Sequence, residues 1–200
     1  MGVGLCLPQL GPWVDPVVIG EFARKAEALG YSSLWVQDHF LYPLQPRRWY
    51  GGEGVLPPEQ YKSVFSPIET LAFVAASTSK VDLGTSVLVG GNHWPVSLAQ
   101  RLATVDNMCS GRLVVGLGVG WNAEEHDASG TTIARRGERM DDFIPALLAC
   151  WNDDPVQYEG PVFHIPPSHV SPKPIQRPRP KLMSGMWSPS GLERTAKWFD

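Results

Sequence analysis

VDLGTSVLVGGNHWPVSLAQRLATVDNMCSGRLVVGLGVGWN, residues 81–122, is the stretch that decides the fold of this chain. It opens with a β-branched and aliphatic run (81–90) and closes with a second one (112–120), and both have the composition of buried strands. Between them, apolar residues recur at the spacing of one helix face: Leu98, Leu102, Val105 and Cys109. Strand, helix and strand in this order predict a parallel βαβ unit, in which the polar and glycine-rich strand ends carry the chemistry.

Strands and helices alternate along the rest of the chain as well. Further strands are predicted at 2–7, 33–37 and 180–185, and further helices at 16–29, from 67, at 135–151 and near 190. The last helix begins either from a capping box at Ser190 and Glu193 or from Ser188 followed by proline. Pro145 lies inside a helical pattern and predicts a kink or a break there. The alternation predicts a single α/β domain over residues 1–200, with a parallel sheet and right-handed crossovers.

The composition is that of an ordinary globular protein. The 200 residues are 43% hydrophobic and 18% charged. The formal net charge is −3, so the sequence lacks the excess of positive charge that is typical of proteins that bind nucleic acid or an anionic membrane. No apolar run approaches the roughly 20 residues of a membrane helix, and no export signal opens the sequence. We expect a cytoplasmic protein in which Cys6, Cys109 and Cys150 are buried thiols. The histidines lack the spacing of metal ligands, so no bound metal is expected.

Two long stretches carry many prolines, glycines and aromatic residues without a helix or strand period. Residues 40–66 connect a strand to a helix, and a connection of this length in a compact domain is usually functional. We therefore interpret residues 40–66 as a long active-site loop. Residues 154–180 are interpreted as a proline-rich insertion before the last strand.

Five segments occur in the order and spacing of a known family. They are AEALGYSSLWVQDHF (26–40), SPIETLAFVAASTSKVDLGTSVL (66–88), PVSLAQRLATVDNMCSGRLVVGLGVGWNAEE (95–125), RRGERMDD (135–142) and the turn at 184–195. Through them the chain resembles the bacterial luciferase-like family of flavin- and deazaflavin-dependent oxidoreductases, particularly its coenzyme F420-dependent branch. The resemblance implies a TIM-barrel-like (β/α)8 fold of roughly 250 residues or more. Because only five strands are predicted here, we expect a truncated barrel, either a fragment or a shortened form.

The resemblance assigns a catalytic role to His39, which follows the strand at 33–37. A histidine at this place in F420-dependent relatives lies near the reactive carbon of the deazaflavin and assists proton movement during hydride transfer. An imidazole suits this role because it titrates near neutrality. The alternative is a partly buried histidine that hydrogen-bonds to the strand end. Asp38 is expected at the same site, as a residue that orients the local backbone or His39.

The resemblance also implies how the strand ends approach a flat cofactor. It places a non-proline cis peptide at Ser86–Val87, as a bulge against the central ring of the cofactor. The glycines of GLGVG (116–120) do not have the GxGxxG spacing of a dinucleotide fingerprint. They are interpreted instead as a close backbone approach, with Gly120 and Trp121 at the cofactor rim. Relatives that oxidise sugar phosphates carry a glutamate where this chain has Trp121, which argues against that substrate class.

The turn before the last helix is the predicted phosphate site. Unpaired backbone N–H groups and the helix dipole favour an anion at a helix N-terminus, and in the family this turn binds the phosphate of FMN or F420. Simple helix capping is the alternative. The residues assigned to the phosphate are Gly185, Met186, Ser188 and Ser190. Arg135, Arg136 and Glu138 are interpreted as solvated helix-surface charges, although the arginines could contact an anionic cofactor tail.

Together these features predict an oxidoreductase that uses coenzyme F420, or alternatively FMN. The reaction would be hydride transfer or monooxygenation of a small organic substrate, because the chemistry belongs to the cofactor. The second hypothesis is a non-catalytic flavin-binding short-barrel protein or an inactive fragment. The resemblance also implies a homodimer.

Overall fold

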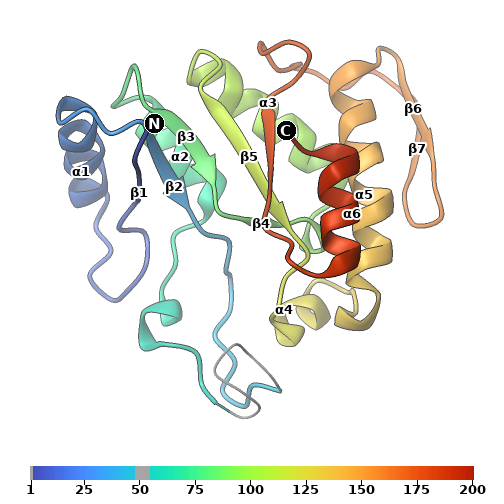
Figure 1. Cartoon of the computed structure of the whole chain (residues 1–200), viewed down its shortest axis with the longest axis horizontal. Helices are drawn as coiled ribbons and strands as arrows, with labels where there is room; N and C mark the ends of the chain where they lie inside the picture. Colours follow the sequence, from blue (N-terminus) through green and yellow to red (C-terminus); the bar gives the residue numbers. More distant parts are fainter. Residues whose placement is uncertain (1, 48–54) are drawn as a thin grey trace.

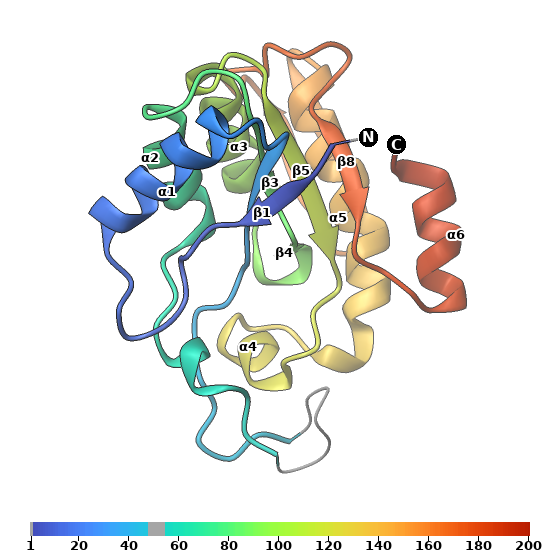
Figure 2. The same ribbon diagram turned by 60° about the vertical axis from the view of Figure 1, so that its left-hand side comes forward.

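The computed structural model describes residues 2–47 and 55–200 (Figures 1 and 2). Its main sheet is parallel throughout and has the order β1-β2-β3-β5, with β8 on the far side of β5. The strands are β1 (Gly4–Cys6), β2 (Ser33–Val36), β3 (Asp82–Thr85), β4 (Leu88–Val89), β5 (Leu113–Gly118) and β8 (Lys181–Ser184). The five strands predicted from the sequence are confirmed. β3 and β4 are two parts of one of them, and both pair with β5 on either side of a cis peptide at Ser86–Val87.

The described residues form the helices that the sequence predicts and one further helix, at 123–128, that it did not predict. The helices are α1 (Pro16–Ala28), α2 (Pro67–Ala75), α3 (Pro95–Met108), α4 (Ala123–Ala128), α5 (Arg136–Asn152) and α6 (Pro189–Trp198), with single 3-10 turns at Glu59–Lys62, Gly90–Asn92 and Ile133–Arg135. α2 packs between α1 and α3, and α5 packs beside α3 and α6 (Figure 2). Proline at the first position fixes the backbone at the start of α1, α2, α3 and α6. None of the helices among residues 2–47 and 55–200 is long and apolar enough to cross a membrane.

The core lies between the sheet and the helices around it. The apolar face predicted for α3 is buried, since Leu98, Leu102 and Val105 are at most 2% exposed. α5 packs beside it, and the indole N–H of Trp151 donates to the carbonyl oxygen of Ala99 at 3.0 Å. The sequence predicts a kink or a break at Pro145; α5 continues through this residue, so the predicted break is wrong. Proline removes one helical hydrogen bond, but buried residues before and after it hold both halves of the helix against the core.

Trp35 of β2 covers the neighbouring glycines of the sheet. A Cβ atom added to Gly84 of β3 would clash with the indole ring, and one added to Gly4 of β1 would lie 2.5 Å from its Nε1. The indole N–H itself donates to the hydroxyl of Ser33 at 2.9 Å. The small residues on the two flanking strands therefore make the space that this large ring occupies.

The proline-rich stretch 154–180 contains a hairpin that the sequence did not predict. β6 (Val156–Glu159) pairs antiparallel with β7 (His164–Ser168), and the prolines within β7 hide the strand period. The buried Asp142 of α5 anchors the hairpin, because its carboxylate accepts from the backbone N–H groups of Val162 and Phe163, each at 2.8 Å. Asp106 of α3 anchors the following turn in the same way.

The cysteines only partly follow the expectation. Cys109 and Cys150 are buried free thiols, and burial raises the pKa of Cys150 to about 11. Cys6 is exposed, which contradicts the prediction of a buried thiol. The reason is its position in β1, an edge strand that pairs only with β2 among the described strands.

Candidate functional site

A cavity of about 960 Å³ opens at the carboxyl ends of the parallel strands. It is the place where α/β proteins of this type bind ligands, and its volume is that of a typical cofactor pocket. The residues assigned to the site from the sequence that line this cavity are Asp38, His39, Ser86, Val87, Gly120, Trp121, Gly185, Met186 and Ser188. Ser190 is not among the lining residues, but its hydroxyl lies 3.3 Å from that of Ser188. The strand ends therefore converge on one hollow.

His39 lies on the wall of the cavity in a defined orientation. Its ring packs edge-on against Tyr61, with the centroids 4.9 Å apart, and is tilted against Trp121. Its Nδ1 lies 3.1 Å from Oε1 of Glu125, a residue that is 2% exposed. Sequence reasoning did not select Glu125.

The Asp38 carboxylate supports the backbone of β4 and, among the described residues, forms no hydrogen bond with the His39 ring. Its Oδ2 accepts from the backbone N–H of Val89 and lies 2.9 Å from Nε2 of His93. Of the two roles left open by the sequence, the structure therefore places Asp38 in the first. The carboxylate that contacts His39 comes from α4 instead.

The floor of the cavity is built around Thr85 and Val87. The Thr85 hydroxyl accepts from the N–H of Gly116 at 2.8 Å and donates to the carbonyl oxygen of the same residue at 2.9 Å. These bonds lie at the end of β3, where the strand is interrupted before β4. A Cβ atom on Gly118 or Gly185 would lie 2.7 or 2.9 Å from the side chain of Val87. These two glycines leave room for the side chain of Val87 at the floor.

The turn before α6 contributes a helix N-terminus to the cavity. Ser188 is the cap residue, because its hydroxyl accepts from the backbone N–H of Gly191 at 3.1 Å. This observation decides between the two caps that the sequence left open. Gly191 also lines the cavity, so the first turn of α6 is next to the space that a ligand would fill.

Among the residues that the structure describes, three guanidinium groups line the same cavity: those of Arg47, Arg136 and Arg194. Arg194 forms a two-point ion pair with Asp141 at 2.6 and 2.8 Å, and this carboxylate raises the pKa of the guanidinium. Arg136, interpreted from the sequence as a helix-surface charge that could contact an anionic cofactor tail, is half-buried and lines the cavity. The sequence could not reveal the group because α5 and α6 bring two of its members together only in the folded chain.

The loop at 40–66 forms one side of the cavity through Arg47 and Tyr61. Arg47 binds the carboxylates of Glu124 and Asp127 on α4, at 3.2 and 2.5 Å. The Tyr61 hydroxyl donates to the side-chain oxygen of Gln37 at 3.2 Å. The middle of the predicted active-site loop, residues 48–54, lies outside the described residues.

The donor set of this cavity fits a flat group that carries phosphate. Arginines and a capped helix N-terminus are the usual partners of phosphate oxygens, and the Val87 floor and Trp121 offer surfaces to a planar ring. Within residues 2–47 and 55–200, no group of three or more histidine, cysteine or acidic side chains could hold a metal ion.

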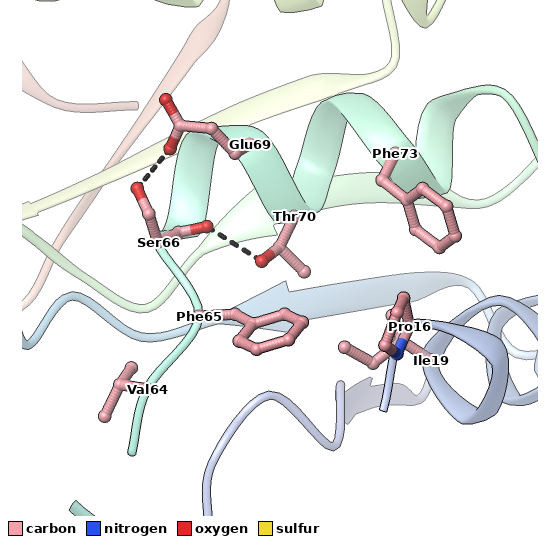
Figure 3. Close-up of a pocket in the computed structure, with 8 residues that line it drawn as sticks. All are labelled: Pro16, Ile19, Val64, Phe65, Ser66, Glu69, Thr70 and Phe73. Atoms are coloured by element: carbon pink, nitrogen blue, oxygen red, sulfur yellow. Dashed lines mark hydrogen bonds between the residues drawn. The ribbon is translucent and has the colours of Figure 1, made fainter. Parts of the chain in front are cut away.

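A second cavity, of about 380 Å³, lies on the outer side of the sheet between α1 and α2 (Figure 3). It shares no lining residue with the first, and its walls include the apolar side chains of Ile19, Phe65 and Phe73. Its polar groups bond to one another: Ser66 contacts Glu69, and the Thr70 hydroxyl donates to the Ser66 carbonyl oxygen at 2.7 Å. Such a cavity offers apolar surface and no free catalytic group.

The sequence profile of the luciferase-like monooxygenase family matches residues 7–200, nearly the whole chain. The chain belongs to the luciferase-like monooxygenase family. Among solved structures, this luciferase-like protein is similar to the monooxygenase RslO1 from Streptomyces bottropensis, with a TM-score of 0.81 and 25% identity over 98% of this chain and 57% of that one. The α/β fold expected from the resemblance is therefore confirmed.

Curated relatives of this luciferase-like chain carry different names. It is 32% identical over 179 residues to the uncharacterized protein Rv0953c of Mycobacterium tuberculosis, covering 88% of this chain and 62% of the relative. It is 32% identical to the F420-dependent glucose-6-phosphate dehydrogenase of Kineococcus radiotolerans and 30% identical to the FMNH(2)-dependent dimethylsulfone monooxygenase of Pseudomonas putida, covering 80% of this chain and 44% of each. The chain thus spans between 44% and 62% of the length of these relatives.

Proposed function

We propose that the cavity binds coenzyme F420 and that the protein transfers hydride between this cofactor and a small organic substrate. The observation that carries the proposal is the meeting of His39 and the α6 N-terminus on one cavity. The first is a proton-transfer group and the second a phosphate-binding element, so a single cofactor could reach both. The F420-dependent relative from Kineococcus radiotolerans supports the choice of cofactor.

The phosphate end of the cofactor would lie at the turn before α6. Gly185, Met186, Ser188 and Gly191 border this part of the cavity, and Ser190 reaches it through Ser188. Arg194 would neutralise phosphate charge, since Asp141 holds its guanidinium in place from one side. Arg136 and Arg47 add positive charge to the same cavity.

The ring end would lie over Ser86 and Val87, between Gly120 and the strand end that carries Asp38 and His39. F420, when bound, supplies a ring carbon that accepts or releases a hydride. His39 would take the hydroxyl proton of an alcohol substrate, or return a proton in the opposite direction. The rings of Trp121 and Tyr61 pack against the imidazole and would shield it from water once the cofactor is bound. Imines and activated alkenes are further candidate substrates.

FMN is the second candidate cofactor, with monooxygenation as its reaction. The FMNH(2)-dependent relative from Pseudomonas putida favours this possibility, and the phosphate-binding turn suits either cofactor. A non-catalytic flavin-binding protein would use the same turn without proton transfer. We propose a homodimer in the cytoplasm for either cofactor, in line with the resemblance.

Titration of the purified protein with F420 and with FMN, followed by fluorescence quenching, tests the proposal. We expect saturable binding of F420 that is tighter than binding of FMN, and reduction of F420 by an alcohol from a small panel. Tighter FMN binding would favour the monooxygenase, and binding without turnover would favour the non-catalytic protein. Absence of binding by both would contradict the proposal.

A further inference from the structure

Glu125 is a buried residue whose carboxylate contacts His39, the catalytic histidine of the proposed function, and the backbone next to it. Its Oε1 is 3.1 Å from Nδ1 of His39 and accepts from the backbone N–H of Phe40, also at 3.1 Å. The residue is 2% exposed and is not part of the cavity wall. It therefore contacts His39 without bordering the cavity.

The first turn of α4 places Glu125 at this position. Asn122 caps the helix, and its side-chain oxygen accepts from the backbone N–H groups of Glu124 and Glu125. The Ser129 hydroxyl closes the other end by donating to the carbonyl oxygen of Glu125 at 2.8 Å. A glutamate three residues after the cap would ordinarily reach back to the N–H of the cap residue. Here its carboxylate instead turns to the strand end that carries His39.

The contact determines which imidazole nitrogen carries the proton. An ionised carboxylate only accepts hydrogen bonds, so two donors, Phe40 N–H and His39 Nδ1–H, share one oxygen. Neutral His39 then holds its proton on Nδ1 and keeps a lone pair on Nε2. Among residues 2–47 and 55–200, Nε2 of His39 has no hydrogen-bond partner. That nitrogen is available to a ligand in the cavity.

We infer that Glu125 is the positioning residue of His39: it fixes the ring orientation and the Nδ1–H tautomer, so that Nε2 serves as the proton acceptor of the site. The inference rests on the proposed function for its catalytic consequence, but the tautomer is a property of the protein alone. The other carboxylate at this strand end, Asp38, is bonded to Val89 and His93 and does not compete for the ring.

Two substitutions separate the charge of Glu125 from its ability to accept a hydrogen bond. Glu125→Gln keeps an oxygen that can accept from Nδ1–H and removes the charge. Glu125→Ala removes both. Asp142→Asn is the matched control, because Asp142 is also buried and also anchors a loop through backbone N–H groups, but lies outside the cavity.

Nitrogen-15 NMR of histidine-labelled protein without cofactor reads the tautomer of His39 directly. We expect the Nδ1–H form in the unchanged protein, in Glu125→Gln and in Asp142→Asn, and a shift toward the Nε2–H form in Glu125→Ala. An unchanged tautomer in folded Glu125→Ala, or an Nε2–H form in the unchanged protein, would overturn the inference. This measurement needs no cofactor, so it remains decisive if neither F420 nor FMN binds.

Single-turnover hydride transfer gives the second measurement. We expect Glu125→Gln to lower the rate at least about tenfold and to change the Kd for F420 less than about threefold, because the charge acts on the imidazolium formed during proton transfer. Asp142→Asn should leave the rate constant of folded protein unchanged. An unaltered rate in folded Glu125→Ala would refute the positioning role. If Glu125→Ala fails to fold, the tautomer of His39 in the unchanged protein still decides, because an Nε2–H form there would overturn the inference.

Discussion

Replacing Glu27 with glutamine should destabilise the fold in a pH-dependent way. Glu27 lies near the end of α1, and its carboxylate accepts from the backbone N–H groups of Ser79, Lys80 and Val81, at 2.6 to 3.1 Å. These bonds attach the α2–β3 connection to α1. Burial of the carboxyl group would raise its pKa, but the backbone hydrogen bonds outweigh this effect and lower the pKa from 4.5 to about 2.

The size of the effect follows from the pKa difference. At about 1.4 kcal/mol for each pKa unit, the full shift from 4.5 to about 2 would correspond to about 3–4 kcal/mol. Because the Glu27 side chain is only partly buried, solvent screening reduces this figure, and we expect a loss of about 1–2 kcal/mol in the free energy of unfolding at pH 7. In a chain of this length, such a loss lowers Tm by about 3–6 °C.

The sign of the pH dependence is fixed by the lowered pKa. The contribution of Glu27 is fully present above its unfolded pKa of 4.5 and is lost as the pH falls from 4.5 to about 2. Urea denaturation followed by tryptophan fluorescence measures the free energy of unfolding of the unchanged protein and of Glu27→Gln. The difference between the two free energies at pH 7 should fall by about half or more at pH 3. Glu21→Gln, on the exposed side of the same helix, should change stability by less than about 0.5 kcal/mol. An equal difference at both pH values would refute the reasoning.

Three further predictions concern the cavity. His39→Ala should lower hydride transfer about 10²- to 10⁴-fold while F420 binding, measured by fluorescence quenching, stays nearly constant; equal turnover would remove His39 from the mechanism. Arg194→Gln should weaken F420 binding about tenfold or more through the lost phosphate contact, whereas an equal loss of affinity for a cofactor fragment without phosphate would point to a general structural effect. Gly116→Ala should destabilise the protein by about 1–3 kcal/mol in thermal unfolding, because the added Cβ would clash with the carbonyl oxygen of Thr85; an unchanged Tm would show that the floor adjusts.

The parallel strands and main helices could be predicted because each has its own local pattern. β5 is a continuous apolar run, and α3 repeats apolar residues at helical spacing. The β6–β7 hairpin could not be predicted, because Pro166 and Pro167 stand where a strand normally donates hydrogen bonds. Its stability comes from Asp142 on another element, a contact that the sequence near the hairpin does not encode.

In the candidate site, too, some residues could be predicted from the local sequence and others could not. His39, Ser86 and Ser188 each follow a strand, so position in the chain was enough to place them at one edge of the sheet. Glu125 and Arg194 lie on helices whose orientation depends on packing. The Asn122–Glu125 spacing is that of a capping box, which is typical of a helix start, but nothing local indicates that the carboxylate contacts His39.

The strand order has a consequence for how the chain reaches its folded form. Each successive main strand pairs with one already laid down, from β1 and β2 through β3 and β5 to β8. A polypeptide leaving the ribosome can thus extend the sheet one βα unit at a time, without threading a late segment between early ones. Growth in this direction adds β8 after the other main strands of the described residues, and the turn that follows β8 then adds Gly185, Met186 and Ser188 to the lining of the hollow.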